Sequence, residues 1–282
     1  MELKSITKKY GNILILDNLS FDLNKGEIVG LIGKNGAGKS TVMKIITQTI
    51  PMYQGDILGN EKVGYLIEEP KLYNNKTGLE HLKYFSEIFG LQFKIDDYKE
   101  LLHSIQLYDD LEKKVKKYSL GMRQKLGIVI SLLTNPEFII LDEPTNSMDI
   151  ETSFEVLQGL KKMVEKKNIG ILISSHKLED IETICDRFLF LRNGKITRQE
   201  KNNNSIVKIT LAEVTKMITY INKHNLGKVI YAGEQELHIN STLKDNYILD
   251  FINKSNIAII DLNIEKRTLR DIYMSESRGE NL

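Results

Sequence analysis

This sequence of 282 residues has only one cysteine, no long apolar run and almost no net charge. The single cysteine, Cys185, excludes an internal disulfide framework and favours a reduced, buried thiol in a cytoplasmic protein. Lysine and arginine total 39 against 38 aspartates and glutamates, so the net charge of +1 argues against a strongly basic nucleic-acid binder. The composition, 41% apolar and 27% charged, is typical of a folded chain with a sizeable core.

No apolar stretch approaches the roughly 18 residues that a membrane-spanning helix needs. The longest candidates lie around residues 126–133 and 138–141. The N-terminal residues, MELKSITKKYGN, lack the apolar core of a signal peptide. We therefore expect a chain that would work at a membrane only as a peripheral subunit, with the membrane-spanning part on a separate polypeptide.

The first two thirds of the sequence alternate between short apolar runs and amphipathic stretches. The apolar runs predict buried strands at residues 26–33, 63–67, 137–141 and 169–174. The amphipathic stretches predict helices at residues 39–50, 78–89, 96–107, 120–134 and 150–167. This alternation predicts an α/β fold with a parallel central sheet covered by helices.

Two further patterns predict strands beside that sheet. Residues 13–23 alternate apolar and polar side chains and predict an antiparallel strand pair. Asn193-Gly194, between two short apolar runs, predicts a hairpin turn.

A polar stretch, QEKNNNS at residues 199–205, predicts a linker between two domains. It would separate a larger domain, residues 1–198, from a small C-terminal accessory domain, residues 206–282. In the smaller domain we expect strands at residues 206–211, 229–231, 237–239 and 257–262, with helices at 213–223 and 243–253. This mixture predicts an α+β domain, and it carries no chemical motif.

Residues 33–40, GKNGAGKS, match the phosphate-loop pattern GxxxxGK[ST], and they stand between a predicted strand and a predicted helix. The glycines let the backbone curl so that its N–H groups face phosphate oxygens, and the helix N-terminus adds partial positive charge. Lys39 would reach the β- and γ-phosphates, and the Ser40 hydroxyl would bind Mg²⁺. We expect a nucleotide to be bound by Gly33, Asn35, Gly36, Gly38, Lys39, Ser40 and Thr41.

The sequence FIILDE, residues 138–143, predicts a buried strand that ends in two carboxylates beside the phosphate loop. There Asp142 could hold Mg²⁺, and Glu143 could polarise an attacking water. Another segment, YSLGMRQ at residues 118–124, opens a predicted helix. Its serine, Ser119, is suited either to capping that helix or to an anion site, and the segment alone does not decide between them.

The order of these motifs, followed by a histidine after a strand, resembles the ATP-binding subunits of ABC transporters. The resemblance covers residues 1–198. It implies a P-loop ABC ATPase domain with a mixed central sheet, an antiparallel β side sheet and a helical subdomain at about residues 71–135. It also implies ATP hydrolysis with Mg²⁺.

Individual residues acquire roles through the same resemblance. The segment YSLGMRQ resembles the signature motif, usually LSGGQ, with Leu120 and Met122 as departures. In the family this motif binds the ATP of the other subunit. That role would fall to Ser119, Gly121 and Gln124.

Three more residues match family positions. Asp149 matches the aspartate of the D-loop, in a segment where Met148 replaces the usual leucine. His176 matches the switch histidine that contacts the γ-phosphate, which adds it to Lys39 and Glu143 as a catalytic residue. Tyr10 matches the aromatic residue that stacks on adenine, although a strand-packing role for this tyrosine also remains open.

One departure concerns the Q-loop, where Glu68 stands in the place of the usual glutamine within GYLIEEP. A carboxylate offers Mg²⁺ a charged oxygen, so Glu68 joins Ser40 and Asp142 as an expected metal ligand. Glutamate at this position resembles the subgroup that exports lantibiotics, and drift without a change of substrate is the alternative. The segment TLRDIYM, residues 268–274, resembles the tail of bacitracin-resistance and lantibiotic-immunity subunits, with Arg270 replacing an acid.

The resemblance also implies partners. Two such subunits, expected to be identical chains, would pack head to tail around two ATP molecules at the cytoplasmic face of the membrane. Their opening and closing would drive a separate transmembrane permease, docked near residues 69–91, that exports a peptide antibiotic. Export of another hydrophobic or amphipathic compound is the first alternative. A soluble ABC ATPase acting on ribosomes or nucleic acid is disfavoured by the single phosphate loop and the neutral charge, and we expect no nucleic-acid partner.

Overall fold

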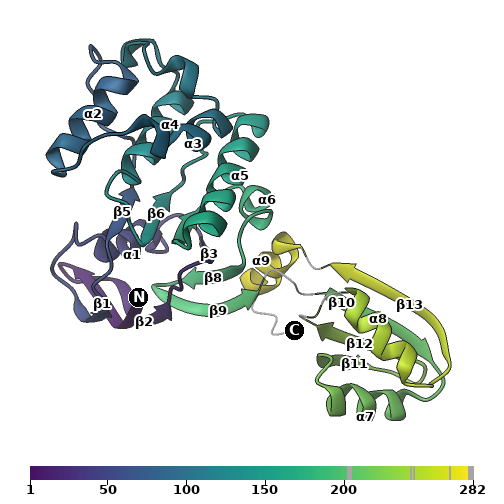
Figure 1. Ribbon diagram of the computed structural model, residues 1–282. Coiled ribbons are helices and arrows are strands. Elements are labelled where there is room, and N and C mark those ends of the chain that lie inside the picture. Colours follow the sequence, from purple (N-terminus) through teal and green to yellow (C-terminus); the bar gives the residue numbers. More distant parts are fainter. Residues whose placement is uncertain (202–204, 242, 244, 267, 279–282) are drawn as a thin grey trace. The chain divides into compact units, whose positions relative to one another are not determined.

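The computed structural model describes residues 1–201, 205–241, 243, 245–266 and 268–278, with no account of the side chains of residue 245 and residues 275–278 (Figure 1). The chain divides into two compact units, Met1–Gln199 and Glu200–Leu282. Each unit has a sheet and a core of its own.

A six-stranded sheet forms the centre of the first unit, in the order β5-β6-β7-β3-β8-β9. Its strands are β3 (Ile28–Ile32), β5 (Val63–Leu66), β6 (Phe138–Asp142), β7 (Gly170–Ser174), β8 (Arg187–Arg192) and β9 (Lys195–Lys201). The pairs from β5 through β8 are all parallel. Parallel strands are covered on both faces, which is why β3 and β7 are buried along their whole length.

The edge strand β9 follows β8 through a two-residue turn, Asn193-Gly194. Both residues have positive φ, 49° and 76°, as the tight hairpin turn predicted for this dipeptide requires. Strand β9 runs on through Lys201, and strand β10 begins at Ser205. The division between the units, after Gln199, lies at the start of the stretch predicted as a linker. Residues 199–201 and 205 of that stretch belong to strands, and residues 202–204 lie outside the described residues. Polar composition misled the prediction, because an edge strand with one solvated face needs few apolar side chains.

A second sheet lies beside the first, in the order β2-β1-β4, and its pairs are antiparallel. Its strands are β1 (Glu2–Tyr10), β2 (Ile13–Asp22) and β4 (Gln54–Leu58). Residues 13–23 were expected to form a strand pair, which is wrong, because they form one strand. At Asn18, where φ is 50°, a β-bulge shifts the alternation of buried residues, and this shift imitates the break between two strands.

Helices cover the central sheet and gather in a helical subdomain at the end of the unit away from β1 and β2 (Figure 1). The subdomain contains α2 (Gly78–Ile88), α3 (Lys99–Ser104) and α4 (Leu120–Ser131). The remaining helices of this unit are α1 (Lys39–Ile46), α5 (Ile150–Lys167) and α6 (Leu178–Glu182). Helix α2 begins at a capping box, in which Thr77 Oγ1 accepts from the Glu80 N–H and Glu80 accepts from the Thr77 N–H.

The helix predicted at residues 96–107 is broken. A 3₁₀ turn, Ile95–Asp97, precedes the short helix α3, and Tyr98 between them has φ −121° and ψ −3°. Its phenol oxygen lies 3.4 Å from the Leu133 carbonyl oxygen, and its ring stacks on Phe93. The amphipathic pattern did not reveal this break, because the Leu133 contact joins residues that are distant in the chain.

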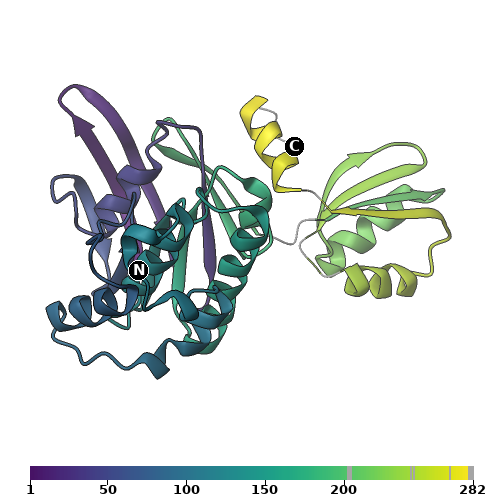
Figure 2. The same ribbon diagram turned by 90° about the horizontal axis from the view of Figure 1, so that it is seen from above.

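The second unit contains a βαββαβ arrangement followed by a helix. Its elements are β10 (Ser205–Leu211), α7 (Val214–His224), β11 (Lys228–Ala232), β12 (Glu236–Ser241), α8 (Asp245–Lys254), β13 (Ile259–Lys266) and α9 (Leu269–Arg278). The sheet order is β11-β12-β10-β13, with all pairs antiparallel, which is a ferredoxin-like topology. Both α7 and α8 lie on one face of this sheet and bury its inner side chains (Figure 2).

Candidate functional site

The predicted phosphate loop lies between β3 and α1. Gly36 and Gly38 both have positive φ, 80° and 108°, where a side chain would strain the backbone. A Cβ at Gly38 would also lie 2.8 Å from Leu16 Cδ2, whereas one at Gly36 would meet nothing within 4 Å. Space beside Gly36 leaves the backbone open to a bound group. Gly38 precedes α1 without any side chain that caps it, so the first N–H groups of the helix remain available for an anion.

Lys39 is the first residue of α1, and only 6% of it is exposed. Its Nζ donates to the carbonyl oxygens of Gly33, at 2.7 Å, and Lys34, at 3.3 Å. Burial lowers the pKa of Lys39, and the nearby charges of Glu143 and Asp142 oppose that effect. The ammonium group therefore lies folded onto the phosphate loop, between its carbonyl oxygens and two carboxylates.

Asp142 ends strand β6 next to the phosphate loop, as predicted. Its Oδ2 accepts from the Ser40 hydroxyl at 2.6 Å, and its Oδ1 accepts from the Ser174 hydroxyl at 2.6 Å. Ser174 is fully buried and is the neighbour of Asp142 in the register of β6 with β7. Hydroxyl and carboxylate oxygens are the ligands that Mg²⁺ prefers, so Ser40 and Asp142 fit that ion.

Glu143 follows Asp142 with a left-handed backbone, φ 52°. Its N–H donates to Ser174 Oγ at 3.1 Å, and its Oε1 lies 2.6 Å from His176 Nε2. The structure thus brings together four side chains whose most distant members, Ser40 and His176, are more than 130 positions apart in the sequence. The other two are Asp142 and Glu143. Ser174 was not predicted, although it connects Asp142 to the backbone of Glu143. The only sequence signal for it was its place at the end of a strand, two residues before His176.

Glu68 does not join this group. Its Oε1 lies 2.6 Å from Lys44 Nζ on α1, and φ at Glu68 is 66°. The hydrogen bond from Lys44 lowers the pKa of Glu68, and the same bond raises the pKa of Lys44. In the part of the chain that the structure describes, no three His, Cys, Asp or Glu side chains gather as a metal site. While Glu68 is paired with Lys44, Mg²⁺ at Ser40 and Asp142 would complete its shell with phosphate oxygens and water, as this ion commonly does.

Tyr10 ends strand β1, and 48% of it is exposed. Lys8 Nζ lies 4.8 Å from the centre of its ring and donates to the Met52 carbonyl oxygen. Half of Tyr10 is open to solvent, so its ring is accessible to a ligand.

The signature segment opens helix α4. Ser119 caps the helix, with its Oγ accepting from the Met122 N–H at 3.1 Å. A Cβ at Gly121 would lie 3.4 Å from Met148 Cγ and 3.4 Å from the Ser147 carbonyl oxygen, so the start of α4 packs on the D-loop segment. Gln124 is only 5% exposed, and its buried Oε1 has no hydrogen-bond partner among the described residues. The structure therefore places Gln124 inside the subdomain.

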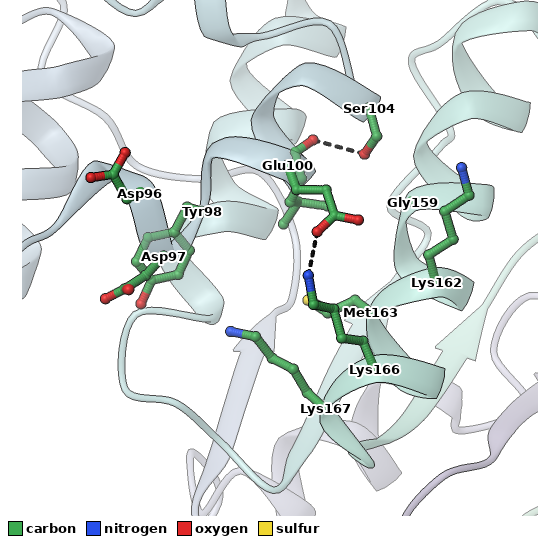
Figure 3. A pocket seen from close by; sticks show the side chains of 11 residues that line it. Asp96, Asp97, Tyr98, Glu100, Ser104, Gly159, Lys162, Met163, Lys166 and Lys167 are labelled. Atoms are coloured by element: carbon green, nitrogen blue, oxygen red, sulfur yellow. Dashed lines mark hydrogen bonds and ion pairs between the residues drawn. The ribbon is translucent and has the colours of Figure 1, made fainter.

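Asp149 caps α5, with its carboxylate accepting from the Thr152 N–H at 2.9 Å and from the Thr152 hydroxyl at 3.0 Å. These hydrogen bonds lower the pKa of Asp149. A cavity of about 290 Å³ lies further along the same helix, between α3 and α5 (Figure 3). An ion pair between Glu100 and Lys166 crosses it, and none of the predicted site residues lines it. The cavity is thus a gap between packed helices, separate from the phosphate loop.

A phosphate loop next to a carboxylate pair at the end of a parallel strand defines a P-loop nucleoside-triphosphatase. A family model described as "ABC transporter" matches residues 16–146. No helix in the described ranges combines the length and apolar character that crossing a membrane requires.

Curated relatives extend the likeness to the whole chain. The uncharacterized ABC transporter ATP-binding protein YhcH of Bacillus subtilis is 30% identical over 305 residues, covering 99% of this chain and 96% of that protein. Lantibiotic transport ATP-binding protein SrtF of Streptococcus pyogenes is 36% identical, covering 73% and 92%. Bacitracin transport ATP-binding protein BcrA of Bacillus licheniformis is 32% identical, covering 78% and 77%. The chain belongs to the ATP-binding proteins of ABC transporters.

Solved structures agree with this assignment. An ATP-binding subunit of an ABC transporter superposes with a TM-score of 0.62 at 31% identity, covering 71% of this chain and 89% of that one. A dimeric ATP-binding cassette in a post-hydrolysis state, bound to ADP and Pi, superposes with a TM-score of 0.59 at 25% identity, covering 71% and 98%. The expected ABC ATPase fold is confirmed.

Proposed function

We propose that this chain hydrolyses ATP as one of two identical subunits, and that hydrolysis drives a separate permease that exports a peptide antibiotic. The observation that carries the proposal is the cluster of Ser40, Asp142, Glu143 and His176 beside the phosphate loop. The cluster contains two oxygen ligands for Mg²⁺, a carboxylate that can accept a proton from water, and a histidine that can contact the γ-phosphate.

The chemistry follows from these residues. Backbone N–H groups of the phosphate loop and Lys39 would bind the phosphates, while Tyr10 would stack on the base. Glu143 takes a proton from water as the water oxygen bonds to the γ-phosphorus. The bond to the bridging oxygen breaks, which yields ADP and phosphate. Mg²⁺ held by Ser40 and Asp142 would neutralise charge on the phosphates. His176, 2.6 Å from Glu143, would orient that carboxylate and contact the γ-phosphate.

A second copy would complete each site. Ser119 and Gly121 stand at the N-terminus of α4, where helix N–H groups favour an anion. The ATP of the partner subunit would supply that anion, because its γ-phosphate can accept from donors of both chains. One relative of known structure is a dimer bound to ADP and Pi, which supports this arrangement. Hydrolysis would remove the shared γ-phosphate and let the subunits part.

The permease would be another polypeptide, with this chain bound peripherally at the cytoplasmic face of the membrane. In this chain, the segment that docks on the permease would be residues 69–91. Four large apolar side chains of this segment are exposed: Tyr73, Ile88, Phe89 and Leu91. Tyr84 and Phe85 are half-buried and contact each other edge to face, so they hold the segment in shape more than they enlarge the docking surface. Exposed apolar side chains gathered within one segment favour a protein partner.

The cargo assignment depends on relatives and on one residue. SrtF is named for lantibiotic transport and BcrA for bacitracin transport, and Glu68 replaces the glutamine usual in the family. Both named cargoes are peptide antibiotics, so we place this chain in their efflux, for resistance or self-immunity. Export of another amphipathic compound is the alternative.

Affinity purification from detergent-solubilised membranes of the host tests the transport role. We expect a stoichiometric membrane protein with several spans to co-purify with the tagged chain. Recovery with ribosomes or nucleic acid and without a membrane partner would refute transport while leaving ATP hydrolysis intact. Deletion of the gene, complemented by the wild type or by Glu143→Gln, then tests the cargo against a panel of peptide antibiotics and unrelated amphipathic drugs. Peptide export predicts sensitivity to peptides that only the wild type reverses.

A further inference from the structure

An ion pair connects the helix after the phosphate loop to the loop that carries Glu68. Lys44 lies in the last turn of α1, and its Nζ is 2.6 Å from Glu68 Oε1. The side chains are 30% and 67% exposed, respectively. A glutamine in place of Glu68 would carry no charge, so this ion pair depends on the departure from the family pattern.

The loop that follows β5 and carries Glu68 is also packed against α4, the helix that begins at the signature segment. A Cβ at Gly127 of α4 would lie 2.9 Å from Leu66 Cδ1 and 3.0 Å from Pro70 Cβ. Leu66 and Pro70 flank Glu68 and thus lie directly on α4. The loop is anchored to α4 by close packing on both sides of Glu68, and to α1 by the ion pair. Lys44 is therefore part of a connection from the phosphate-loop helix to the helix that Ser119 caps.

The two attachments differ in strength. Close packing around a buried glycine is costly to disturb, because the interior is dense. An exposed ion pair is weak and is screened by salt, so it shifts an equilibrium by less than about tenfold. The double positive charge of a divalent cation attracts the Glu68 carboxylate more strongly than the single charge of the Lys44 ammonium group does. The ion pair is consequently the attachment that a bound Mg²⁺–nucleotide complex would release.

We propose that Lys44 is a positioning residue that holds the Glu68 carboxylate on α1, and that Glu68 must leave Lys44 before it can approach the metal at Ser40 and Asp142. The ion pair then sets how much Mg²⁺ the protein needs to bind ATP tightly. This inference rests on the proposed function, because it assumes that the phosphate loop binds Mg²⁺–ATP.

A simpler role for Lys44 is available. A lysine near the C-terminus of α1 stabilises that helix through its dipole, whatever residue 68 is. The two roles differ in one respect that can be measured. The dipole role makes the effect of replacing Lys44 independent of Glu68, whereas the positioning role makes it vanish without Glu68.

The experiment titrates Mg²⁺ against full-length protein at a fixed ATP concentration and follows ATP binding by calorimetry, with Glu143→Gln present throughout to prevent hydrolysis. Lys44→Met should lower the Mg²⁺ concentration for half-maximal binding about threefold to fivefold, because Glu68 is released. Lys44→Arg should restore the wild-type midpoint. Lys71→Met is the matched control: Lys71 also lowers the pKa of Glu68 through its charge, but the hydrogen bond comes from Lys44. It should leave the midpoint within about 1.5-fold of wild type.

The same titration in the Glu68→Gln background decides between the two roles. Lys44→Met should then have no effect on the midpoint. An equal shift in both backgrounds, no shift in either, or an equal shift from Lys71→Met would overturn the inference. Thermal unfolding without nucleotide confirms that each variant is folded. Failure of the Glu143→Gln parent to bind Mg²⁺–ATP at all would instead refute the proposed function.

Discussion

His176 Nε2 lies 2.6 Å from Glu143 Oε1, although the two residues follow different strands, β7 and β6. The backbone of Glu143 is held as well, because its N–H donates to Ser174 Oγ. Side chain and backbone are thus both fixed before a substrate is bound. A carboxylate positioned in this way beside a phosphate loop is suited to act as a general base.

The first prediction concerns that base. Glu143→Gln keeps the shape of the side chain but removes its capacity to accept a proton, so turnover should fall about 10²-fold to 10⁴-fold. ATP-dependent dimerisation should persist, because phosphate binding depends on other residues. Phosphate release and light scattering with ATP measure the two properties. Hydrolysis at the wild-type rate would show that Glu143 is not the base.

A second prediction concerns the buried ammonium group. Lys39→Ala should weaken ATP binding about tenfold to a hundredfold, the size of one lost charge-assisted hydrogen bond. Lys34→Ala removes the same charge from the same loop at an exposed position and serves as the control. Fluorescence titration with a labelled ATP measures both variants. Equal losses in the two would reduce the role of Lys39 to general charge attraction.

Tyr10 gives a third prediction. Tyr10→Ala should weaken ATP binding up to about tenfold, the range of one aromatic stacking contact, whereas Tyr10→Phe should retain it. Inorganic triphosphate lacks a base and should bind Tyr10→Ala as it binds the wild type. A competition assay against labelled ATP makes this comparison. Unchanged ATP affinity in Tyr10→Ala would instead support a strand-packing role.

The fourth prediction concerns pH. The Tyr118 hydroxyl donates to the Asp110 carbonyl oxygen at 2.8 Å, and burial, aided by the charge of Asp110, raises the pKa of Tyr118 to about 12. In the unfolded chain the Tyr118 hydroxyl ionises near pH 10, so the folded state keeps this proton up to a higher pH than the unfolded state does. The contribution of Tyr118 is therefore complete below pH 10 and is lost as pH rises through about 12.

Tyr118→Phe tests this linkage. It should lower the free energy of unfolding by about 1 kcal/mol at neutral pH through the lost hydrogen bond. Between pH 10 and about 12 the wild type should lose stability more steeply than the variant, so the gap between them narrows. Urea unfolding across this range measures both effects. Parallel curves would contradict the assigned pKa of Tyr118.

Much of the site was predictable because its motifs are local. A phosphate loop needs glycines, a lysine and a hydroxyl within eight residues, and the structure has them from the end of β3 into the first turn of α1, as predicted. Helix α5 spans Ile150–Lys167, the predicted range, because Asp149 caps its start and Asn168, with φ 51°, ends it. Such signals act between neighbours in the chain, so the sequence displays them directly.

Other features depend on residues that are distant in the chain, and only the tertiary structure decided them. The helix predicted at residues 96–107 breaks at Tyr98, whose phenol oxygen lies 3.4 Å from the carbonyl oxygen of Leu133. At Asn18 the N–H donates to Thr7 Oγ1 of the neighbouring strand, and a β-bulge shifts the register there. The sequence pattern resembled a break between two strands, because register depends on the neighbouring strand.

The sequence by itself determined the class of chemistry, because phosphate binding is encoded in one short loop and the carboxylates that follow one strand. The tertiary structure decided which side chains meet there. It brought the Ser174 hydroxyl to both Asp142 and the backbone of Glu143, and it paired Glu68 with Lys44. An ion pair or hydrogen bond requires atoms within a few ångströms, and that proximity arises only when the sheet has assembled.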